Sequence, residues 1–213
     1  DDAHLLADGQ FLTADIRNCR VLIVDPDTSK ITTQWGQPGQ CKHDPPRTLA
    51  WPNGATPMDN GDILVSEITG SWISRITRAG KVVWSVPAPK VKYPSDAFPT
   101  VDGKQVIVAD FSKPGRVVIF DPLTGKASWE YFVAEGEGML DHSSIARELP
   151  ETGDVLIVDD LNDRVIVVDR QTKAIIWQYG VKGTKGHAPG LLNYPDGVDL
   201  DVFRDWRMPA AAR

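Results

Sequence analysis

The pair of runs Arg164-Val-Ile-Val-Val-Asp169 and Ile175-Ile-Trp177, joined by a polar turn, is the second half of a unit that recurs along the chain. Each copy ends in a tryptophan that closes a short β-rich run, and successive tryptophans lie 45 to 49 residues apart. A repeat of about 45 residues is the period of a β-propeller blade, in which a large ring on the outer strand packs between blades. The four tryptophans are Trp35, Trp84, Trp129 and Trp177.

Two further runs precede this pair in every copy. The nearer run is apolar and ends in an acidic residue, and the farther run opens the unit at its innermost position. Four runs separated by Gly, Asp and Asn turns predict an antiparallel four-stranded sheet. The runs that end in an acid are Phe11–Asp15, Ile63–Glu67, Val106–Asp110 and Val155–Asp159.

The sequence therefore predicts an all-β fold in a single domain over residues 1–213. This fold is a β-propeller with four complete four-stranded blades and one extra inner strand. The extra strand indicates a partial six-bladed ring, with about one and three-quarter blades expected upstream of Asp1. The blades are expected at about 1–36, 53–86, 95–132 and 142–179, and the extra strand at about 196–203.

Composition limits the partners of the chain. The 213 residues are 41% hydrophobic and carry a formal charge of -6. No Lys/Arg-rich stretch offers a footprint for phosphates, so nucleic acid is not an expected partner. No apolar run approaches the roughly 18 residues of a membrane span, and no signal-like segment opens the chain. Because the chain begins with Asp1 and not Met, we expect a processed product or a fragment.

Several segments resemble known propeller repeats. Ala14–Val21 and Asp160–Val165 resemble NHL-type repeats, and Asp121–Trp129 is similar to the tryptophan-docking repeat of quinoprotein-like propellers. Nearly the whole chain resembles bacterial propellers of the quinoprotein-like and arylsulfotransferase-like kind, which implies a fold more than an activity. Quinone-dependent dehydrogenases need eight blades and an adjacent Cys pair that this chain lacks, so no quinone is predicted. The absence of Gly-rich phosphate motifs argues against a nucleotide.

Polar residues open the innermost strands, and the chain direction places these openings on one rim of the pore. Carboxylates that meet there without Lys or Arg raise one another's pKa unless a cation intervenes. Ca²⁺ takes oxygen ligands of this kind, and six-bladed lactonases and phosphotriesterases, which have a similar architecture, hold Ca²⁺ at this place. The sequence predicts such a site, with a water-filled polar pore as the alternative. The candidate ligands are Asp2, Asn53, Asp96, Asp141 and Asp196.

Two histidines are candidate catalytic residues. His142 opens an inner strand beside a carboxylate, as a general base would need. Consecutive strand residues point to opposite faces, which weakens a Ser/His/Asp interpretation and leaves a pore-lining histidine as the alternative. His43 lies in a long rim loop and is the second candidate, because arylsulfotransferase-like propellers, which the chain resembles, use a loop histidine as nucleophile.

Two further sets are candidate substrate-binding residues at the same rim. The acids Glu67, Asp110 and Asp159 end the second strands, and their alternative role is to cap the turns that follow. The aromatic set would form an apolar wall for a small hydrophobic or sugar-like ligand, or else fix the loops that enter the strands. Its members are Trp51, Trp72, Tyr93 and Tyr194.

Cys19 and Cys41 are predicted to form a disulfide, because the start of the third strand and the loop after the outer strand share the rim within one blade. A disulfide indicates an extracytoplasmic protein, whether secreted, periplasmic or on the cell surface. Two function classes remain open. The favoured one is a metal-assisted hydrolase of lactones, esters or phosphotriesters at the pore rim, because converging carboxylates are costly to maintain without a cation. The other is a non-catalytic propeller that presents its rim to a protein or a small ligand.

A ring that lacks blades exposes two sheet faces, and exposed apolar faces attract partners. We therefore expect a homodimer that forms through the exposed blade faces. Multi-angle light scattering should give twice the mass of one chain. A monomeric mass across a wide concentration range would contradict this prediction.

Overall fold

The computed structural model describes residues 3–200, in which the strands form four antiparallel sheets of four. In each sheet every strand pairs with its neighbours in the sequence, so each sheet is one blade and the four-bladed prediction is confirmed. Blade 1 contains β1 (Ala3–Leu5), β2 (Phe11–Asp15), β3 (Arg20–Asp25) and β4 (Lys30–Gly36). Blade 2 contains β5 (Pro52–Pro57), β6 (Ile63–Glu67), β7 (Trp72–Ile76) and β8 (Val82–Pro87). Blade 3 contains β9 (Pro94–Pro99), β10 (Val106–Asp110), β11 (Arg116–Asp121) and β12 (Lys126–Phe132), and blade 4 contains β13 (Ser143–Glu148), β14 (Val155–Asp159), β15 (Arg164–Val168) and β16 (Ile175–Gly180).

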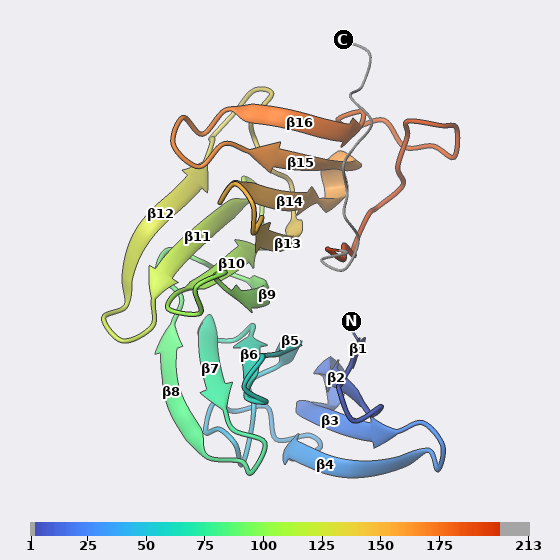
Figure 1. Cartoon of the computed structure of the whole chain (residues 1–213), viewed down its shortest axis with the longest axis vertical. Helices are drawn as coiled ribbons and strands as arrows, with labels where there is room; N and C mark the ends of the chain where they lie inside the picture. Colours follow the sequence, from blue (N-terminus) through green and yellow to red (C-terminus); the bar gives the residue numbers. More distant parts are fainter. Residues whose placement is uncertain (1–2, 201–213) are drawn as a thin grey trace.

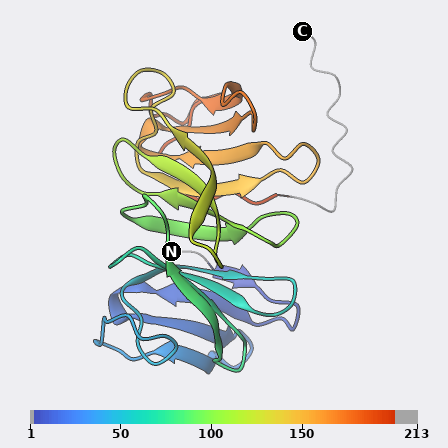
Figure 2. The ribbon, with the colours of Figure 1, turned by 90° about the vertical axis from the view of Figure 1, so that its left-hand side faces the viewer.

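The blades form an arc with their first strands at the centre and their fourth strands at the periphery (Figure 1). The view turned by 90° shows the sheets layered in chain order (Figure 2). Helical structure in residues 3–200 is confined to two 3-10 turns, η1 (Ile16–Asn18) and η2 (Asp160–Asn162). Accordingly, no described helix is long and apolar enough to cross a membrane.

Apolar side chains fill the space between neighbouring blades. Every strand alternates its side chains between two faces, so a central blade contributes to the core on both sides. In blade 2, Ile63 and Val65 belong to the core shared with blade 1, whereas Leu64 and Ile73 belong to the core shared with blade 3. The blades therefore stabilise one another by burying sheet faces, and no blade buries its apolar surface alone.

The repeated tryptophans connect each blade to the next, as the structural interpretation of the repeat requires. Trp129 of blade 3 donates its indole N–H to the carbonyl of Arg170, 2.8 Å away in the turn between β15 and β16. Trp35 of blade 1 lies against Gly80, in the corresponding turn of blade 2. Trp177 of blade 4 is 45% exposed because no described blade follows it.

The predicted fifth inner strand at 196–203 is not found in the described residues. Residues 196–200 lie in no strand, and 201–203 lie outside the described residues. The segment still reaches the centre of the arc, where Val198 packs on the core of blades 3 and 4. A strand requires a ladder partner for its N–H and C=O groups, and no strand of residues 3–200 pairs with this segment.

The predicted disulfide is confirmed: Cys19 and Cys41 are bonded, with their Cα atoms 5.2 Å apart. The bond ties the start of β3 to the connection between β4 and β5. This connection is further held by a hydrogen bond from the Gly36 N–H to the Pro46 carbonyl and by a bridge between Asp44 and Thr48. The loop is therefore fixed at both ends before it enters blade 2.

Replacing both cysteines by serine should lower the free energy of unfolding by about 3 kcal/mol, since the bond closes a loop of 22 residues. Urea denaturation of the oxidised protein and of the double variant would measure this loss. Two free thiols in the denatured, unreduced protein would contradict the assignment of the bond.

Candidate functional site

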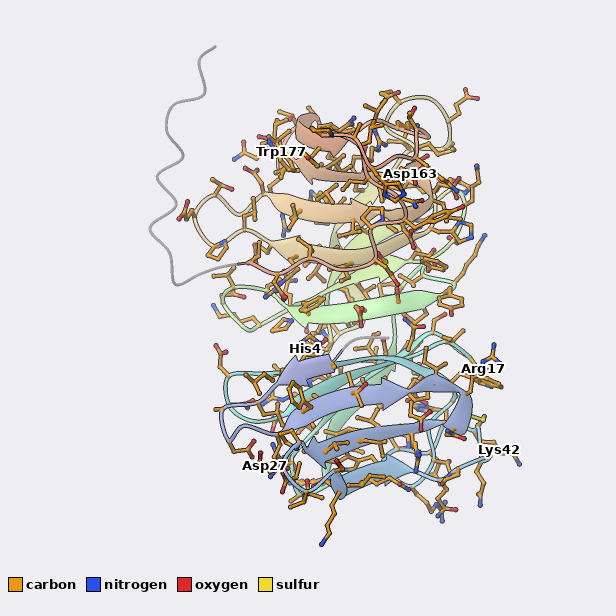
Figure 3. The ribbon with its side chains drawn as sticks, turned by 90° about the vertical axis from the view of Figure 1, so that its right-hand side faces the viewer. His4, Arg17, Asp27, Lys42, Asp163 and Trp177 are labelled. Atoms are coloured by element: carbon orange, nitrogen blue, oxygen red, sulfur yellow. A yellow bond between two sulfur atoms is a disulfide. The ribbon has the colours of Figure 1, made fainter. Side chains whose placement is uncertain are left out.

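One rim of the arc carries the loops that enter the inner strands together with the connections between second and third strands. Figure 3 labels Arg17, Lys42 and Asp163 on this side of the molecule and Asp27, in the turn after β3, on the opposite side. We call this side the entry rim. It consists of residues 15–20, 37–51, 67–72, 88–93, 110–116, 133–142 and 159–164.

Buried carboxylates fix how the chain enters the inner strands of blades 2, 3 and 4. Glu67, Asp110 and Asp159 are at most 2% exposed. Each accepts a hydrogen bond from a backbone N–H just before the first strand of its own blade: Ala50 at 2.5 Å, Tyr93 at 2.9 Å and Asp141 at 2.8 Å, respectively. These geometries support the capping alternative for this set, because a buried carboxylate that binds backbone amides has no face open to a substrate.

Burial raises the pKa of two of these acids. It raises the pKa of Glu67, although the Ala50 N–H and the imidazole of His43 act in the opposite direction. It also raises the pKa of Asp159, against hydrogen bonds from the Asp141 N–H and Asn162. In both cases the loss of solvation outweighs the hydrogen bonds.

A continuous row of side chains runs along the entry rim from blade 2 to blade 4. The Tyr93 hydroxyl lies 3.4 Å from Asn53 Oδ1, and the Tyr93 ring centroid lies 5.5 Å from that of Phe111. Phe111 meets the His142 ring edge-on at 4.8 Å, and His142 Nδ1 lies 2.6 Å from Asp141 Oδ1. We call these five residues the rim row. The structure therefore brings three predicted polar candidates together through Tyr93, and Phe111, which follows β10, is a member that the sequence interpretation missed.

His142 contacts its neighbour Asp141 because the backbone is not a strand at this point. His142 has φ 53°, in the left-handed region, and its N–H donates to the Ser112 carbonyl at 2.9 Å. Strand alternation therefore does not apply, and the imidazole turns back to the preceding carboxylate. A bulky residue at positive φ is uncommon and marks a position where the surrounding structure imposes the conformation.

The expectation that no Lys or Arg lies among the inner carboxylates is wrong for Asp141. Lys113 Nζ lies 2.5 Å from Asp141 Oδ2. Burial acts to raise the pKa of Asp141, but the hydrogen bonds from Lys113 and His142 outweigh it and hold the pKa below its ordinary value. The lysine comes from the connection after β10, which carries no repeat signal in the sequence.

The candidate metal ligands do not assemble into a metal site in the described structure. Asn53 donates its amide to the carbonyl and hydroxyl oxygens of Ser95, and Asp96 is buried over Gly54, where a Cβ atom would lie 1.9 Å from its Oδ1. Asp2 lies outside the described residues. Within residues 3–200, no group of three or more His, Cys, Asp or Glu side chains is arranged to hold a metal ion.

Acidic side chains gather beside the rim row at blade 4. Asp160 is 6% exposed, and burial together with the nearby charges of Asp196 and Asp163 raises its pKa to about 6. Asp160 Oδ1 and Asp163 Oδ2 are buried, and no described residue hydrogen-bonds either atom. We call Asp160, Asp163 and Asp196 the acidic cluster.

The remaining candidates divide between the rim and the interior. Trp51 is 40% exposed and open to a ligand, whereas Tyr194 is 49% exposed but has Lys185 Nζ over its ring, 3.4 Å from the centroid. Trp72 instead stacks on His43, with ring centroids 4.0 Å apart. His43 therefore lies in a separate cluster and does not join His142.

The fold and the entry rim define a quinoprotein-like β-propeller. The protein family described as outer membrane protein assembly factor BamB matches residues 17–192, and the chain belongs to this family. The match does not single out NHL-type or arylsulfotransferase-like repeats. No curated protein matches the chain.

Solved structures share the fold. Virginiamycin B lyase from Staphylococcus aureus is 16% identical with a TM-score of 0.58, over 83% of this chain and 54% of that chain. Hydrazine synthase from Kuenenia stuttgartiensis is 13% identical with a TM-score of 0.59, over 83% of this chain and 47% of that chain. At these identities the likeness concerns the fold alone, and this chain spans about half the length of those chains.

The raised pKa of Asp160 predicts a pH-dependent stability. A carboxyl whose pKa is higher in the folded state stabilises the fold at low pH, and this contribution is lost as the pH rises through about 6. Asp160→Asn should therefore stabilise the protein by about 1–2 kcal/mol at pH 7.5 and by much less at pH 4.5. Urea denaturation at both pH values tests this, with Asp27→Asn on the opposite rim as the control. An equal effect of Asp160→Asn at both pH values would contradict it.

Proposed function

We propose that the chain is a binding scaffold whose entry rim holds a protein segment carrying basic side chains. The observation that carries the proposal is that the rim row and the acidic cluster adjoin: the N–H of Leu161, next to Asp160, donates to the Asp141 carbonyl at 3.1 Å. His142 lowers the pKa of Asp160 through its charge while Asp196 and Asp163 raise it, so these groups share one electrostatic environment. A ligand there would meet the rings of the rim row and the carboxylates of the acidic cluster.

The charge of the acidic cluster favours a cationic ligand. Asp160 and Asp163 are buried, whereas Asp196 is exposed and lies close enough to raise the pKa of Asp160, so Asp196 presents the negative charge of the cluster to a ligand. A lysine or arginine side chain would supply both donors and charge. The neighbouring rings of Tyr93, Phe111 and His142 would contact its aliphatic part or stack on its guanidinium.

The family supports a scaffold more than an enzyme. Its description as an outer membrane protein assembly factor concerns proteins that act on other proteins, and the disulfide of this chain is consistent with a place outside the cytoplasm. We therefore propose an extracytoplasmic location, with a protein segment in preference to a small molecule as the ligand.

Hydrolysis is the second candidate, and one observation favours it. The hydrogen bond between His142 and Asp141 orients an imidazole of which the side chain is 32% exposed, as a general base requires. The Ca²⁺ of this hypothesis would require Asn53, Asp96, Asp141 and Asp196 to turn toward one another, and Lys113 already compensates the charge of Asp141.

The binding proposal is tested with tetralysine as the probe, by isothermal titration calorimetry at low ionic strength. We expect binding that weakens at least fivefold in Asp160→Asn and in His142→Ala, and that weakens between pH 7.5 and pH 5 as Asp160 is protonated. Trp177→Ala, an exposed residue of the outer strand β16, is the control and should bind normally. Equal binding of tetraglutamate, or no effect of Asp160→Asn, would overturn the proposal.

The same preparations separate the second candidate. An aryl ester, a lactone and a phosphotriester are assayed before and after chelation, with the metal content measured in parallel. Activity that a chelator abolishes, that Ca²⁺ restores and that falls at least tenfold in His142→Ala would favour the hydrolase. A folded, metal-free protein that is inactive on all three substrates and binds tetralysine would favour the scaffold.

A further inference from the structure

Blade 2 departs from the other blades at one structurally equivalent position. In every blade the last residue of the second strand pairs with the first residue of the third strand. In blades 1, 3 and 4 this pair is an aspartate and an arginine, whereas in blade 2 it is Glu67 and Trp72. The aspartate–arginine pairs are Asp15 with Arg20, Asp110 with Arg116, and Asp159 with Arg164.

The arginine has a structural role where it is present. Arg164 is fully buried, and its Nε lies 2.8 Å from Asp159 Oδ2 while its Nη1 bonds Gln178 of the outer strand at 3.0 Å. Arg20 makes the same two contacts in blade 1, with Asp15 and Gln34. In blades 1 and 4 one cation thus joins the acid to an outer-strand side chain, whereas in blade 3 Arg116 pairs with Glu130 of the outer strand.

In blade 2 an imidazole from outside the sheet takes the place of the guanidinium. His43 belongs to the connection between β4 and β5, and its Nδ1 lies 3.0 Å from Glu67 Oε1. Its Nε2 lies 3.3 Å from the hydroxyl of Ser85, the blade 2 residue at the position of Gln34 and Gln178. The cluster therefore joins a carboxylate, an imidazole and a hydroxyl, and it is closed by the Ser74 hydroxyl, which lies 2.8 Å from Ser85 Oγ and 3.5 Å from Glu67 Oε1.

Several contacts hold the imidazole in this orientation. The ring of His43 stacks on Trp72, with planes 6° apart, and the Cys19–Cys41 disulfide anchors the loop two residues away. Glu67 alternates with Ile63 and Val65 on the face toward blade 1, and Ser74, opposite Ser85 in the ladder, lies on that same face. Small serines at these positions leave room for the imidazole where other blades carry longer side chains.

We propose that Ser85, His43 and Glu67 form a second, metal-independent site that transfers the acyl group of small esters. A nucleophile within hydrogen-bond reach of a base, with the base oriented by a third group, is the geometric criterion for such a site, and distances are often longer without substrate. Glu67 accepts from Nδ1–H, which leaves Nε2 to accept the proton of the Ser85 hydroxyl. The Ser85 side chain is half-buried and the His43 side chain is 22% exposed, so a small ester can approach both.

The chemical step is balanced by these groups. Ser85 Oγ attacks the ester carbonyl carbon as His43 Nε2 takes the hydroxyl proton, and the resulting imidazolium is stabilised by the Glu67 carboxylate. Collapse of the tetrahedral intermediate breaks the bond to the alkoxy oxygen, which takes the proton from His43 and leaves as an alcohol. Water then attacks the acyl-serine in the same way and releases the acid. β8 is the outer strand of its sheet, and an edge strand offers backbone N–H groups of the kind that stabilise an oxyanion.

The alternative is that His43 only substitutes for the missing arginine, and covalent labelling distinguishes the two. The oxidised protein is treated with a fluorophosphonate probe, and the labelled residue is identified by peptide mass spectrometry. We expect labelling at Ser85 that is lost in Ser85→Ala and slowed at least a hundredfold in His43→Ala. Ser128→Ala, an outer-strand serine of blade 3 that bonds Gln105, should be labelled like the wild type.

A second readout removes the ambiguity of a destabilised variant. Added imidazole should restore labelling of Ser85 in His43→Ala, which a purely structural histidine would not allow. Glu67→Gln should slow labelling, and circular dichroism should show that this variant is folded. Hydrolysis of p-nitrophenyl acetate should follow the same order of variants. Folded wild-type protein that is not labelled at Ser85, or labelling at the same rate in His43→Ala, would overturn the proposal. Neither result bears on tetralysine binding at the acidic cluster, so the two proposals fail independently.

Discussion

A buried carboxylate closes the second strand of three of the four blades, and an ionised carboxylate can be buried only if donors surround it. This requirement determines the local structure around each blade's inner strand. The carboxylate takes a backbone N–H from the chain about to enter the sheet, and that bond fixes where the inner strand begins. The second donor differs between blades: it is Arg164 in blade 4 and His43 in blade 2. The polar groups at the rim are therefore, in part, the donors that these buried carboxylates require.

The stable part of the molecule and the reactive part use different portions of the same strands. Residues such as Val65 bury apolar area between blades, and Trp129 adds a hydrogen bond across the boundary. At the rim end of the same strands, polar residues are held by this packing without contributing to it. Such sites are precise because sheets and not flexible loops position them. Rim residues outside the strands are held by other contacts: His142 by a hydrogen bond to the Ser112 carbonyl, and the loop of His43 by the disulfide.

Most of the fold could be predicted from the sequence because each blade repeats its strands and its tryptophan. The rim could be predicted because the strands that reach it begin or end at recognisable polar residues. The disulfide could also be predicted, since both cysteines fall at rim positions of one blade. The contacts of Lys113 with Asp141 and of His43 with Ser85 could not, because they join segments 28 and 42 residues apart and depend on loop paths that carry no periodic signal. The conformation of His142 was missed for a related reason: the residue was treated as part of a strand, whereas its positive φ places it in a turn.

His4 of β1 meets the ring of Phe98 in β9, with centroids 6.5 Å apart, so the first blade contacts the third across the centre of the arc. In a repeat protein whose units contact only their neighbours, unfolding can start at an end and proceed unit by unit. A contact that skips a blade changes this behaviour, because separating blade 1 breaks its contacts with blade 2 and blade 3 at once. The first strand therefore couples blade 1 to blade 3, and the first three blades should unfold as one cooperative unit instead of one after another.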